Sequence, residues 1–410
     1  MSAAAASPDL APSTTRRLLP LGIAGDSSWA SHLDRYGPLA PLDAAEVERS
    51  GLTGRGGAGF PTAVKLAAVA SRRHAVVVAN GTEGEPVSSK DAVLMTYNPH
   101  LVVDGVVSAM GLVGAREAFV AVSRDSAVRA LEAALSERPS DAKRIQLVVV
   151  PNRFVAGEES ALVNFINGSD AKPTFTPPRP FERGVDGLPT LVQNVETLAN
   201  LALIARFGAA WFRGAGTETE PGTVLVTVAG AVKRPGVVEV ELGLPLRAVV
   251  ERCGGLSAPV QAVLVGGYFG SWVGASALDL PLSMSSVPLG ARALVVMPAD
   301  VCGVAESARV LRYLAGESAG QCGPCVFGLP AVAEAFESIA GGRRDARKAF
   351  DRLPRLAAQI ARRGACAHPD GALRFADSAL RVFEREIDLH LGGRCSGTRR
   401  EPLLPTGGGS

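Results

Sequence analysis

The segment ESAGQCGPC, residues 317–325, constrains this chain most, because it places two cysteines in one short turn. Cys322 and Cys325 form a C-x-x-C pair, and Cys366 follows much later in GACAHPDG. Two close thiols and a distant third are typical of a metal or iron–sulfur site: the pair chelates from one turn, and the third sulfur closes the shell from another segment. Pro324 lies between the paired thiols and has no N–H, so the turn frees neighbouring amides to point at sulfur.

Spacing alone leaves two other interpretations of these thiols open, a buried pair and a redox-active C-x-x-C. A cubane cluster with C-x2-C-x2-C spacing needs a further thiolate at position 319, where this chain has Ala319. The segment therefore predicts a metal or cluster site with three cysteine ligands, one fewer than a complete cubane shell.

Length and composition exclude several classes of protein. A chain of 410 residues is long enough for two to four domains. Its 42 Lys and Arg against 40 Asp and Glu leave a net charge of +2, which gives no electrostatic reason to expect nucleic acid or an anionic membrane as partner. Six clustered cysteines do not make a disulfide scaffold, so we expect a reducing, cytoplasmic compartment. No apolar run is long enough to span a membrane.

The two ends of the chain have the composition of disordered tails. The first residues, MSAAAASPDLAPSTTRR, lack basic residues ahead of an apolar stretch, which argues against a secretory signal. The last ones, EPLLPTGGGS, are rich in glycine and proline. We therefore predict disordered tails over 1–20 and 398–410.

A glycine-rich loop in SGLTGRGGAGFPTAVKL is the first candidate binding element. Gly54, Gly56 and Gly59 satisfy G-x-G-x-x-G, but the preceding DAAEVERSG is helical in pattern, which argues against a standard dinucleotide turn. Glycines allow close backbone approach, and a helix opening at Pro61 has free N–H groups that attract phosphate. Lys65, one turn into that helix, favours this interpretation over a flexible surface loop.

Alternating strands and helices follow the glycine loop and predict an α/β fold with a mostly parallel sheet. The first buried strand runs straight into GTEGEPVSSKD, which carries Glu83 and Glu85, and ligands bind at such strand ends. The expected strands are 74–80, 117–123 and 145–150, and the expected helices follow Pro99 and cover 125–137.

Further polar residues lie at the starts of two expected helices. Glu158 and Glu159 open the helix in FVAGEESALVNFING, where capping explains acidic residues nearly as well as ligand binding does. The segment VQNVETLANLALIARFG is predicted to be helical, with Gln193 and Asn194 at its start.

The second half of the chain predicts two more domains. Two strands, a short helix and a further strand from about 220 predict a compact β-grasp-like module. Apolar residues at helical spacing predict a bundle whose loops hold the three cysteines discussed above. Cys253 and Cys302 are expected to pack in cores as small apolar side chains. The expected helices of the bundle are 304–315, 328–340, 347–362 and 372–391.

The motifs together resemble the FMN-binding flavoprotein subunit of respiratory NADH dehydrogenase, the F subunit, which has relatives in NAD-linked hydrogenases and formate dehydrogenases. They are GRGGAGFPTAVKL, NGTEGEP, FVAGEESAL, KPTF, NVETLAN, GAVKRPGVVEV and ESAGQCGPC followed by CAHPD. The resemblance implies a Rossmann-like FMN and NADH domain at 21–218, a β-grasp (ubiquitin-like, SLBB-type) domain at 219–300 and a helical iron–sulfur domain at 301–397.

The resemblance also implies roles for individual residues. It places FMN against Gly54, Gly56, Gly57 and Lys65, with Asn80, Glu83, Gly157 and Glu158 around the flavin and Gln193 and Asn194 on its phosphate side. It places the NADH adenine between Phe60 and Phe175, with Lys172, Glu85 and Glu159 as further contacts. Glu83 and Glu85 are the candidate catalytic residues, and Cys322, Cys325 and Cys366 are the candidate ligands of a [4Fe–4S] cluster.

This chain departs from the family pattern at several site positions. Thr82, Phe154 and Gln193 replace residues that would hydrogen-bond near the flavin, each worth about 0.5–1.5 kcal/mol. Ala319 replaces the first cluster cysteine, so a [3Fe–4S] cluster, or a cubane with His368 at its fourth corner, is an alternative to a complete [4Fe–4S] site.

The predicted function is that of a divergent NADH-oxidising flavoprotein subunit, which passes electrons from NADH through FMN and an iron–sulfur cluster. The acceptor would be a ferredoxin-like or other iron–sulfur subunit, or a quinone-linked complex to which this chain is peripheral. Two alternatives belong to other classes. One is a cofactor-poor binding or assembly subunit, and the other is a nucleotide-binding protein stabilised by zinc on the three cysteines and His368.

Overall fold

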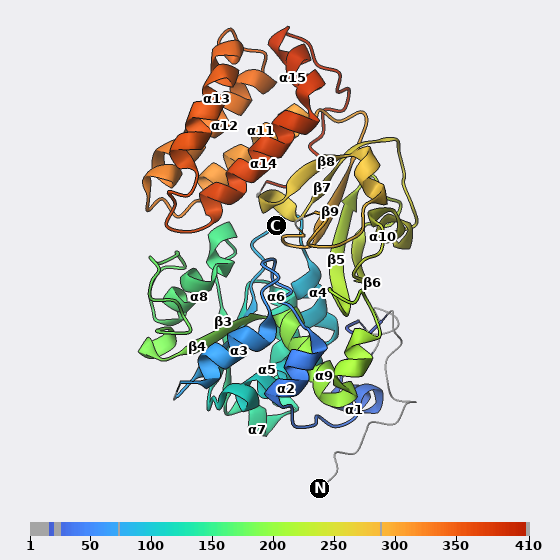
Figure 1. Ribbon diagram of the computed structural model, residues 1–410, viewed down its shortest axis with the longest axis vertical. Helices are drawn as coiled ribbons and strands as arrows, with labels where there is room; N and C mark the ends of the chain where they lie inside the picture. The colour runs from blue at the N-terminus through green and yellow to red at the C-terminus, as the bar shows by residue number, and fades with distance from the viewer. Residues whose placement is uncertain (1–15, 20–25, 73, 288, 407–410) are drawn as a thin grey trace.

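The structure is a computed structural model that describes residues 16–19, 26–72, 74–287 and 289–406. Three regions follow one another along the longest axis: an α/β region, a mostly antiparallel sheet and a helical bundle (Figure 1). The α/β region and the bundle lie at opposite ends, with the second sheet between them on one side.

The first sheet is parallel and confirms the predicted α/β architecture. Its strands run in the order β3-β2-β1-β4. The sequence predicts the first three strands but treats the fourth as the start of a helix, which is wrong. The five residues of that strand, TLVQN, lead directly into a helix with Asn194 as N-cap, so no turn residue separates the two elements. The strands are β1 (Val76–Gly81), β2 (Ala118–Val122), β3 (Ile145–Val149) and β4 (Thr190–Asn194).

Helices cover both faces of this sheet because the residues of β1 alternate in direction. Val77 and Ala79 belong to the core that contains α5 (Pro99–Val113) and α9 (Val195–Arg213), whereas Val76 and Val78 pack with α8 on the other face. The remaining helices of this region are α1 (Trp29–Tyr36), α2 (Ala44–Ser50), α3 (Thr62–Ala70), α4 (Lys90–Tyr97), α6 (Asp125–Ser136), α7 (Pro139–Ala142) and α8 (Glu159–Ile166).

The second sheet has the order β6-β5-β9-β7-β8, with β5 parallel to β9 and the other pairs antiparallel. Val263 and Val265 pack toward the helix α10 on one face, and Leu264 between them packs into the core of the helical bundle on the other. This agrees with the predicted β-grasp module. Its elements are β5 (Thr223–Gly230), β6 (Gly236–Glu241), α10 (Leu246–Arg252), β7 (Val260–Val265), β8 (Ser271–Gly274) and β9 (Ala293–Pro298).

The helical region contains the predicted helices, except that the expected helix 372–391 is two helices that break at Phe383 (φ −105°, ψ 25°). A π-helical turn, Pro324–Gly328, contains Cys325. Among the described residues, no helix has the length and apolarity needed to cross a bilayer. The helices are α11 (Gly303–Gly316), α12 (Leu329–Ala340), α13 (Ala346–Ile360), α14 (His368–Val382) and α15 (Glu384–Leu391).

The predicted N-terminal tail, 1–20, lies outside the described residues except for 16–19, and that short piece is docked. The N–H groups of Arg17, Leu18 and Leu19 donate to the buried carboxylate of Glu239 at 2.9–3.1 Å. Leu18 is fully buried in the core of the α/β region. The prediction of disorder is therefore wrong for these residues.

The predicted C-terminal tail, 398–410, is also docked over its described part, 398–406. The N–H of Thr398 donates to the carbonyl of Asp300 at 2.9 Å, and the N–H of Leu404 donates to Glu306 at 2.9 Å. The side chain of Leu404 is 1% exposed and belongs to the core of the helical bundle. The composition of a segment contains no information about the distant surface on which that segment packs. Composition alone therefore predicted disorder here.

Candidate active site

A cavity of about 650 Å³ lies at the carboxyl ends of β1 and β4. From β1 the chain visits β2 and β3 on one side and then returns to place β4 on the other, so the cavity lies at a topological switch point of the sheet. The register sets Asn80 opposite Asn194 and Ala79 opposite Gln193 at this edge. Its volume falls within the range of about 300–1,000 Å³ that ligand pockets occupy.

Most of the predicted FMN and NADH residues line this one cavity. Lys172 and Phe175 are the two predicted residues that do not line it. Lys172 instead forms an ion pair with Asp170 at 3.2 Å, and Phe175 is 76% exposed. Their neighbour Pro173 does line the cavity, so the loop that carries both residues passes close to it. The lining residues among those predicted are Gly54, Gly56, Gly57, Phe60, Lys65, Asn80, Glu83, Glu85, Gly157, Glu158, Glu159, Gln193 and Asn194.

The glycine loop is held in place, so the alternative of a flexible surface loop is wrong. The N–H of Gly54 donates to the carbonyl of Phe60 at 2.8 Å, and Thr53 forms a β-bridge with Pro61. The N–H of Arg55 donates to Thr197 at 2.8 Å, which ties the loop to α9.

The same loop forms a cradle that side chains would fill. Gly57 has φ 116°, and a Cβ there would lie 3.0 Å from the carbonyl oxygen of Gly290. A Cβ on Gly56 would lie 3.1 Å from Cβ of Asn194. The helix α3 begins beside this cradle at Thr62 and has no side-chain cap among the described residues. The N–H of Thr62 donates to the carbonyl of Leu52 at 2.9 Å, so the next N–H groups, those of Ala63 and Val64, are the ones available to an anion. The arrangement fits the phosphate of FMN.

Amide side chains from both strands organise the floor of the cavity. Asn80 donates to the carbonyl of Gly157 at 2.9 Å and accepts from the N–H of Thr82 at 3.1 Å. Asn194 caps α9 and donates to Asp91 at 2.8 Å. These bonds fix the polar groups before any ligand arrives, which lowers the entropic cost of binding.

A buried charge network behind the floor was not predicted as part of the site. The Lys90 ammonium lies 2.6 Å from Asp91 and 2.9 Å from Glu196, and all three side chains are buried. Burial lowers the pKa of Lys90, but the two carboxylates outweigh it and raise that pKa above its ordinary value. In the sequence, the adjacent Lys90 and Asp91 directly after the acidic loop could have indicated this network. No local pattern, however, identifies Glu196 as the second partner of Lys90.

Two buried arginines next to the glycine loop were also missed. Burial, and then the proximity of Arg292, lowers the pKa of Arg55 to about 9. Arg292 donates to the carbonyl of Gly54 at 3.2 Å, and it directly precedes β9, the central strand of the β-grasp sheet. Because the two residues are far apart in sequence, no local pattern could join them.

The candidate catalytic carboxylates hold the loop that contains them. Glu83 accepts hydrogen bonds from the hydroxyl of Ser88 at 2.5 Å and from the N–H groups of Asp91 and Ala92 at the start of α4. Glu85 accepts from the N–H of Tyr268 at 2.7 Å. Both line the cavity, and their catalytic role stays a prediction.

Burial raises the pKa of Glu85 to about 8 from its ordinary value of 4.5. The folded chain therefore holds a proton that the unfolded chain has lost, and stability should fall as pH rises from about 4.5 through about 8. The free energy of unfolding should fall by a few kcal/mol over this pH range. We expect the Glu85→Gln variant to show a smaller fall, because it lacks the titrating group. Urea unfolding at about pH 5 and pH 8.5 checks this expectation. Glu132→Gln, at an exposed position of α6, should leave the decline unchanged, and equal slopes in all three proteins would contradict the assignment.

The acidic pair at the start of α8 divides into two roles. Glu158 is the N-cap and accepts from the N–H groups of Ser160 at 2.9 Å and Ala161 at 3.0 Å, as the capping interpretation predicted. Glu159 forms an ion pair with Lys65 at 2.7 Å across the cavity wall. The pair joins α8 to α3 and sets the ammonium of Lys65 beside the glycine loop.

The three predicted cluster cysteines come together where the π-helical turn meets the loop before α14. Burial, and then the neighbouring Cys322 sulfur, raises the pKa of Cys325 to about 12. The backbone near each sulfur favours its thiolate form, because the main chain at Ala365, Gly320 and His368 acts to lower the pKa of Cys322, Cys325 and Cys366 respectively. Three neighbouring thiols suit three corners of an iron–sulfur cluster. Ala319 precedes Gly320 directly, and its side chain has no ligand atom to offer a fourth corner.

His368 was the candidate for that fourth corner. Its Nε2 lies 2.7 Å from the carbonyl oxygen of Leu314, so this nitrogen carries the proton and donates. Its ring packs edge-on against Phe154 and Phe269, with centroids 5.6 and 5.2 Å away. Only Nδ1 is left to bind a metal.

The cluster site and the cavity share a wall. Cys366, Ala367 and His368 line the same cavity as the glycine loop. A ligand in the cavity would therefore lie beside one of the three cluster sulfurs. Electron transfer from a ligand in the cavity to a cluster in the helical bundle requires the two to be close to each other. The shared wall provides this proximity.

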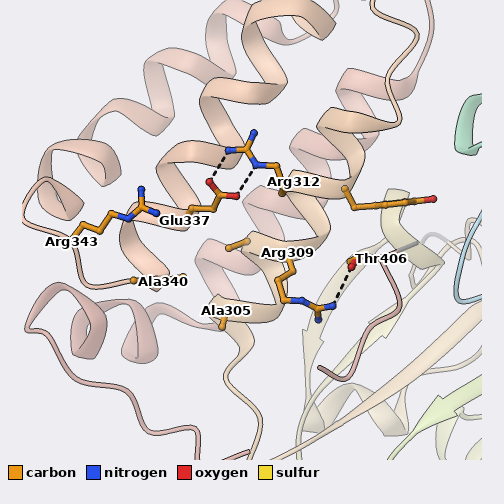
Figure 2. A pocket seen from close by; sticks show the side chains of 10 residues that line it. Ala305, Arg309, Arg312, Glu337, Ala340, Arg343 and Thr406 are labelled. Atoms are coloured by element: carbon orange, nitrogen blue, oxygen red, sulfur yellow. Dashed lines mark hydrogen bonds and ion pairs between the residues drawn. The ribbon is translucent and has the colours of Figure 1, made fainter. Parts of the chain in front are cut away.

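A second cavity of about 600 Å³ lies between α11 and α12 and contains none of the predicted residues. Figure 2 shows Arg312 making two 2.7 Å hydrogen bonds to Glu337, and Arg309 reaching Thr406 of the C-terminal segment at 3.1 Å. Arg309, Arg312 and Glu337 are engaged in these contacts, and none of the predicted site residues lines this cavity, so we place the chemistry in the first one.

Comparison with known families places the same functions on the same parts of the chain. The Nuo51 FMN-binding domain model matches residues 47–203, and the NADH-ubiquinone oxidoreductase-F iron–sulfur binding region matches residues 305–390. An SLBB domain model matches residues 225–267, within the β-grasp sheet.

Individual relatives agree. The second of the NADH-quinone oxidoreductase F subunits of Rhizobium meliloti (strain 1021) is 31% identical over 87% of this chain and 91% of its own length. The NADH-quinone oxidoreductase F subunit of Mycobacterium bovis (strain ATCC BAA-935 / AF2122/97) is 32% identical over 88% and 87%. A chain of an NAD+-reducing [NiFe]-hydrogenase in the H2-reduced state superposes with a TM-score of 0.77 at 30% identity, over 88% of this chain and 63% of that one.

These matches confirm the predicted fold, the FMN site as a property of the first domain and the iron–sulfur site as a property of the bundle. The roles of single residues and the exact domain boundaries stay predictions. The chain belongs to the family of NADH-quinone oxidoreductase F subunits.

Proposed function

We propose that this chain oxidises NADH and delivers the electrons to a partner subunit. The observation that carries the proposal is the shared wall: Cys366 of the cluster site lines the cavity that the glycine loop opens into. When bound, FMN would accept hydride from NADH, and the iron–sulfur centre would carry electrons one at a time.

The residues of the cavity would hold FMN by its phosphate and ring. The glycine loop and the start of α3 supply N–H groups near the phosphate, with Lys65 as the nearby positive charge. Asn80 and Asn194 fix the polar edge of the floor. The rings of Phe154 and Phe269 pack edge to face with centroids 4.7 Å apart and line the same cavity as Cys366, so they would give this part of the cavity an apolar wall.

NADH would enter past two exposed aromatic rings. Phe60 is 52% exposed at the cavity and Phe175 is 76% exposed on the adjacent loop. Aromatic faces bind a purine at little entropic cost, and the exposure of both rings leaves their faces free for one. We propose that they hold the adenine between them.

Replacing both rings, Phe60→Ala with Phe175→Ala, should raise the KM for NADH about tenfold or more and change kcat much less, because adenine binding is the same in ground and transition states. Steady-state kinetics with an artificial electron acceptor measures both constants. Phe181→Ala, a partly buried ring in the core of the α/β region, controls for loss of an aromatic side chain. An unchanged KM in the double variant would remove both residues from the NADH site.

The partner would be a ferredoxin-like or other iron–sulfur subunit, with the assembled complex in the cytoplasm or at the membrane surface. The relatives are named as subunits of larger oxidoreductases, which supports a partner of some kind. Val326 and Phe327 are 46% and 76% exposed directly after Cys325, and a partner that receives electrons from the cluster would cover them.

A visible spectrum of anaerobically purified chain tests the proposal. We expect a flavin band over a broad iron–sulfur absorption, and bleaching of the flavin band when NADH is added. A chain that binds FMN but is not bleached would be a binding or assembly subunit. A colourless chain that contains zinc on Cys322, Cys325 and Cys366 would support the zinc-stabilised alternative instead.

A further inference from the structure

A second group of metal-ligating side chains lies at the far end of the helical region, away from the cavity. Cys302, Glu386, His390 and Cys395 each offer one ligand atom, and these four atoms all lie within 4.8 Å of one another. Cys302 is the N-cap of α11, Glu386 and His390 are one turn apart on α15, and Cys395 follows that helix. Three separate segments thus meet at one point.

The expectation that Cys302 is only a small apolar core residue is therefore incomplete. Its side chain is 8% exposed and does belong to the bundle core. Its sulfur, however, lies 3.2 Å from Nε2 of His390 and 3.8 Å from Oε1 of Glu386. An apolar side chain would not gather an imidazole and a carboxylate around itself.

The spacing fits a single tetrahedral ion. With bonds of about 2.3 Å to sulfur and about 2.0–2.2 Å to nitrogen and oxygen, the ligands of a tetrahedral zinc ion lie about 3.3–3.8 Å from one another. Cys302 Sγ to His390 Nε2, Cys302 Sγ to Glu386 Oε1 and His390 Nε2 to Glu386 Oε1 are 3.2, 3.8 and 3.2 Å. Cys395 completes four ligands within the same small sphere.

We propose that these four residues bind one Zn²⁺ ion as a structural site. Four protein ligands leave no open position, which is the mark of a structural rather than a catalytic zinc site. Two thiolates select a soft ion such as zinc over magnesium or calcium, and imidazole suits zinc as well. The site goes beyond the proposed electron transfer and does not depend on it.

Neighbouring groups already orient the ligands. The N–H of Ala305 donates to the sulfur of Cys302 at 3.4 Å. The N–H of Ser396 donates to Oε1 of Glu386 at 2.9 Å, and the hydroxyl of Ser396 donates to its other oxygen. Such outer contacts fix ligand orientation in metal sites. Ser396 follows Cys395 directly, so one short segment supplies both a ligand and the bonds that position another.

The ion would clip the C-terminal segment to the start of the helical region. A Cβ on Gly397 would lie 2.8 Å from Cβ of Cys302, so the segment crosses that residue in close contact. Beyond the crossing, Leu404 is buried in the bundle core, and Pro405 accepts a hydrogen bond from Tyr268 of the β-grasp domain. The ion would therefore stabilise the docking of residues 395–406, which include the described part, 398–406, of the tail whose composition predicts disorder.

Metal analysis of the full chain, produced with zinc and iron supplied, tests the proposal. The wild type should contain about one zinc per chain besides its iron, and Cys395→Ser should contain almost none while keeping its iron and flavin. Cys395 is the exposed ligand, so its replacement should not prevent folding. Cys253→Ala, in the β-grasp core, is the matched control and should keep the zinc.

Cobalt substitution gives a second, spectroscopic test. Co²⁺ bound to two thiolates should show charge-transfer and ligand-field bands that Cys395→Ser and His390→Ala lose, and Cys322→Ser keeps. Limited proteolysis should cut the segment after residue 394 faster in Cys395→Ser. A folded wild type without zinc when zinc is supplied, zinc that is lost with Cys322 instead, or a Cys302–Cys395 disulfide in the purified chain would overturn the proposal.

Discussion

Gly57→Val is expected to yield a folded chain that contains little FMN. Gly57 adopts φ 116°, and its missing Cβ would lie 3.0 Å from the backbone oxygen of Gly290. A β-branched residue held at such a φ costs about 1–3 kcal/mol, and the contact with Gly290 adds to this cost because backbone cannot move aside as a side chain can. The variant must pay this conformational free energy whenever the loop adopts the shape that binds FMN. The affinity for FMN should therefore fall about tenfold to a hundredfold or more.

Fluorescence titration of the apo-protein with FMN measures the effect. Gly111→Val is the matched control, because Gly111 lies on the exposed face of α5 with nothing within 4 Å of an added Cβ. Circular dichroism and the thermal midpoint of both variants show whether the fold is intact. If Gly57→Val binds FMN as tightly as Gly111→Val does, the loop does not hold the cofactor.

Local patterns predicted the parts of the site that the chain builds from single segments. The buried strand at Val76–Gly81 and the helix with Lys65 are both visible from apolar runs and from glycine and proline punctuation. The acidic loop is assigned to the sheet edge by its position alone, because strand ends gather ligands in parallel sheets. Most of the cavity lining follows from these few rules and from the family motifs.

Features that need two distant segments could not be predicted in this way. Arg292 belongs to the β-grasp domain but donates a hydrogen bond to the glycine loop of the α/β region. Within the α/β region, Glu196 forms an ion pair with Lys90, which is distant in sequence. Glu196 also accepts the N–H of Leu225 at 3.0 Å, so it joins the α/β region to the β-grasp sheet. In the sequence, each of these residues resembles an ordinary charged surface residue. Only their burial beside one another in the structure shows that they belong to the site.

The strand β4 was missed for a different reason. Its five residues enter α9 with Asn194 as both the last strand residue and the helix cap. Helical periodicity of the following nineteen residues dominates any window that covers this junction. The pairing that makes it a strand, with Val76–Asn80, is non-local and was invisible in the sequence.

The second large effect is expected at Ala319. Ala319 directly precedes Gly320, whose backbone is close enough to Cys325 to act on the pKa of that thiol, so residue 319 lies near the three-cysteine site. In air, a cluster held by three thiolates should lose an iron readily, leaving about three irons per chain. Ala319→Cys should add the missing thiolate, hold about four irons and slow the loss in air severalfold or more.

Iron and sulfide analysis of anaerobic protein, followed by the decay of cluster absorption in air, measures this prediction. Ser318→Cys offers the same thiol one residue earlier and so separates ligand geometry from simple thiol content. The prediction requires Ala319→Cys to outlast both Ser318→Cys and the wild type. Equal decay in all three would mean that the loop before Cys322 is not shaped to bring a fourth thiolate to the cluster. Loss of all iron in every protein would instead remove the cluster itself from the assignment.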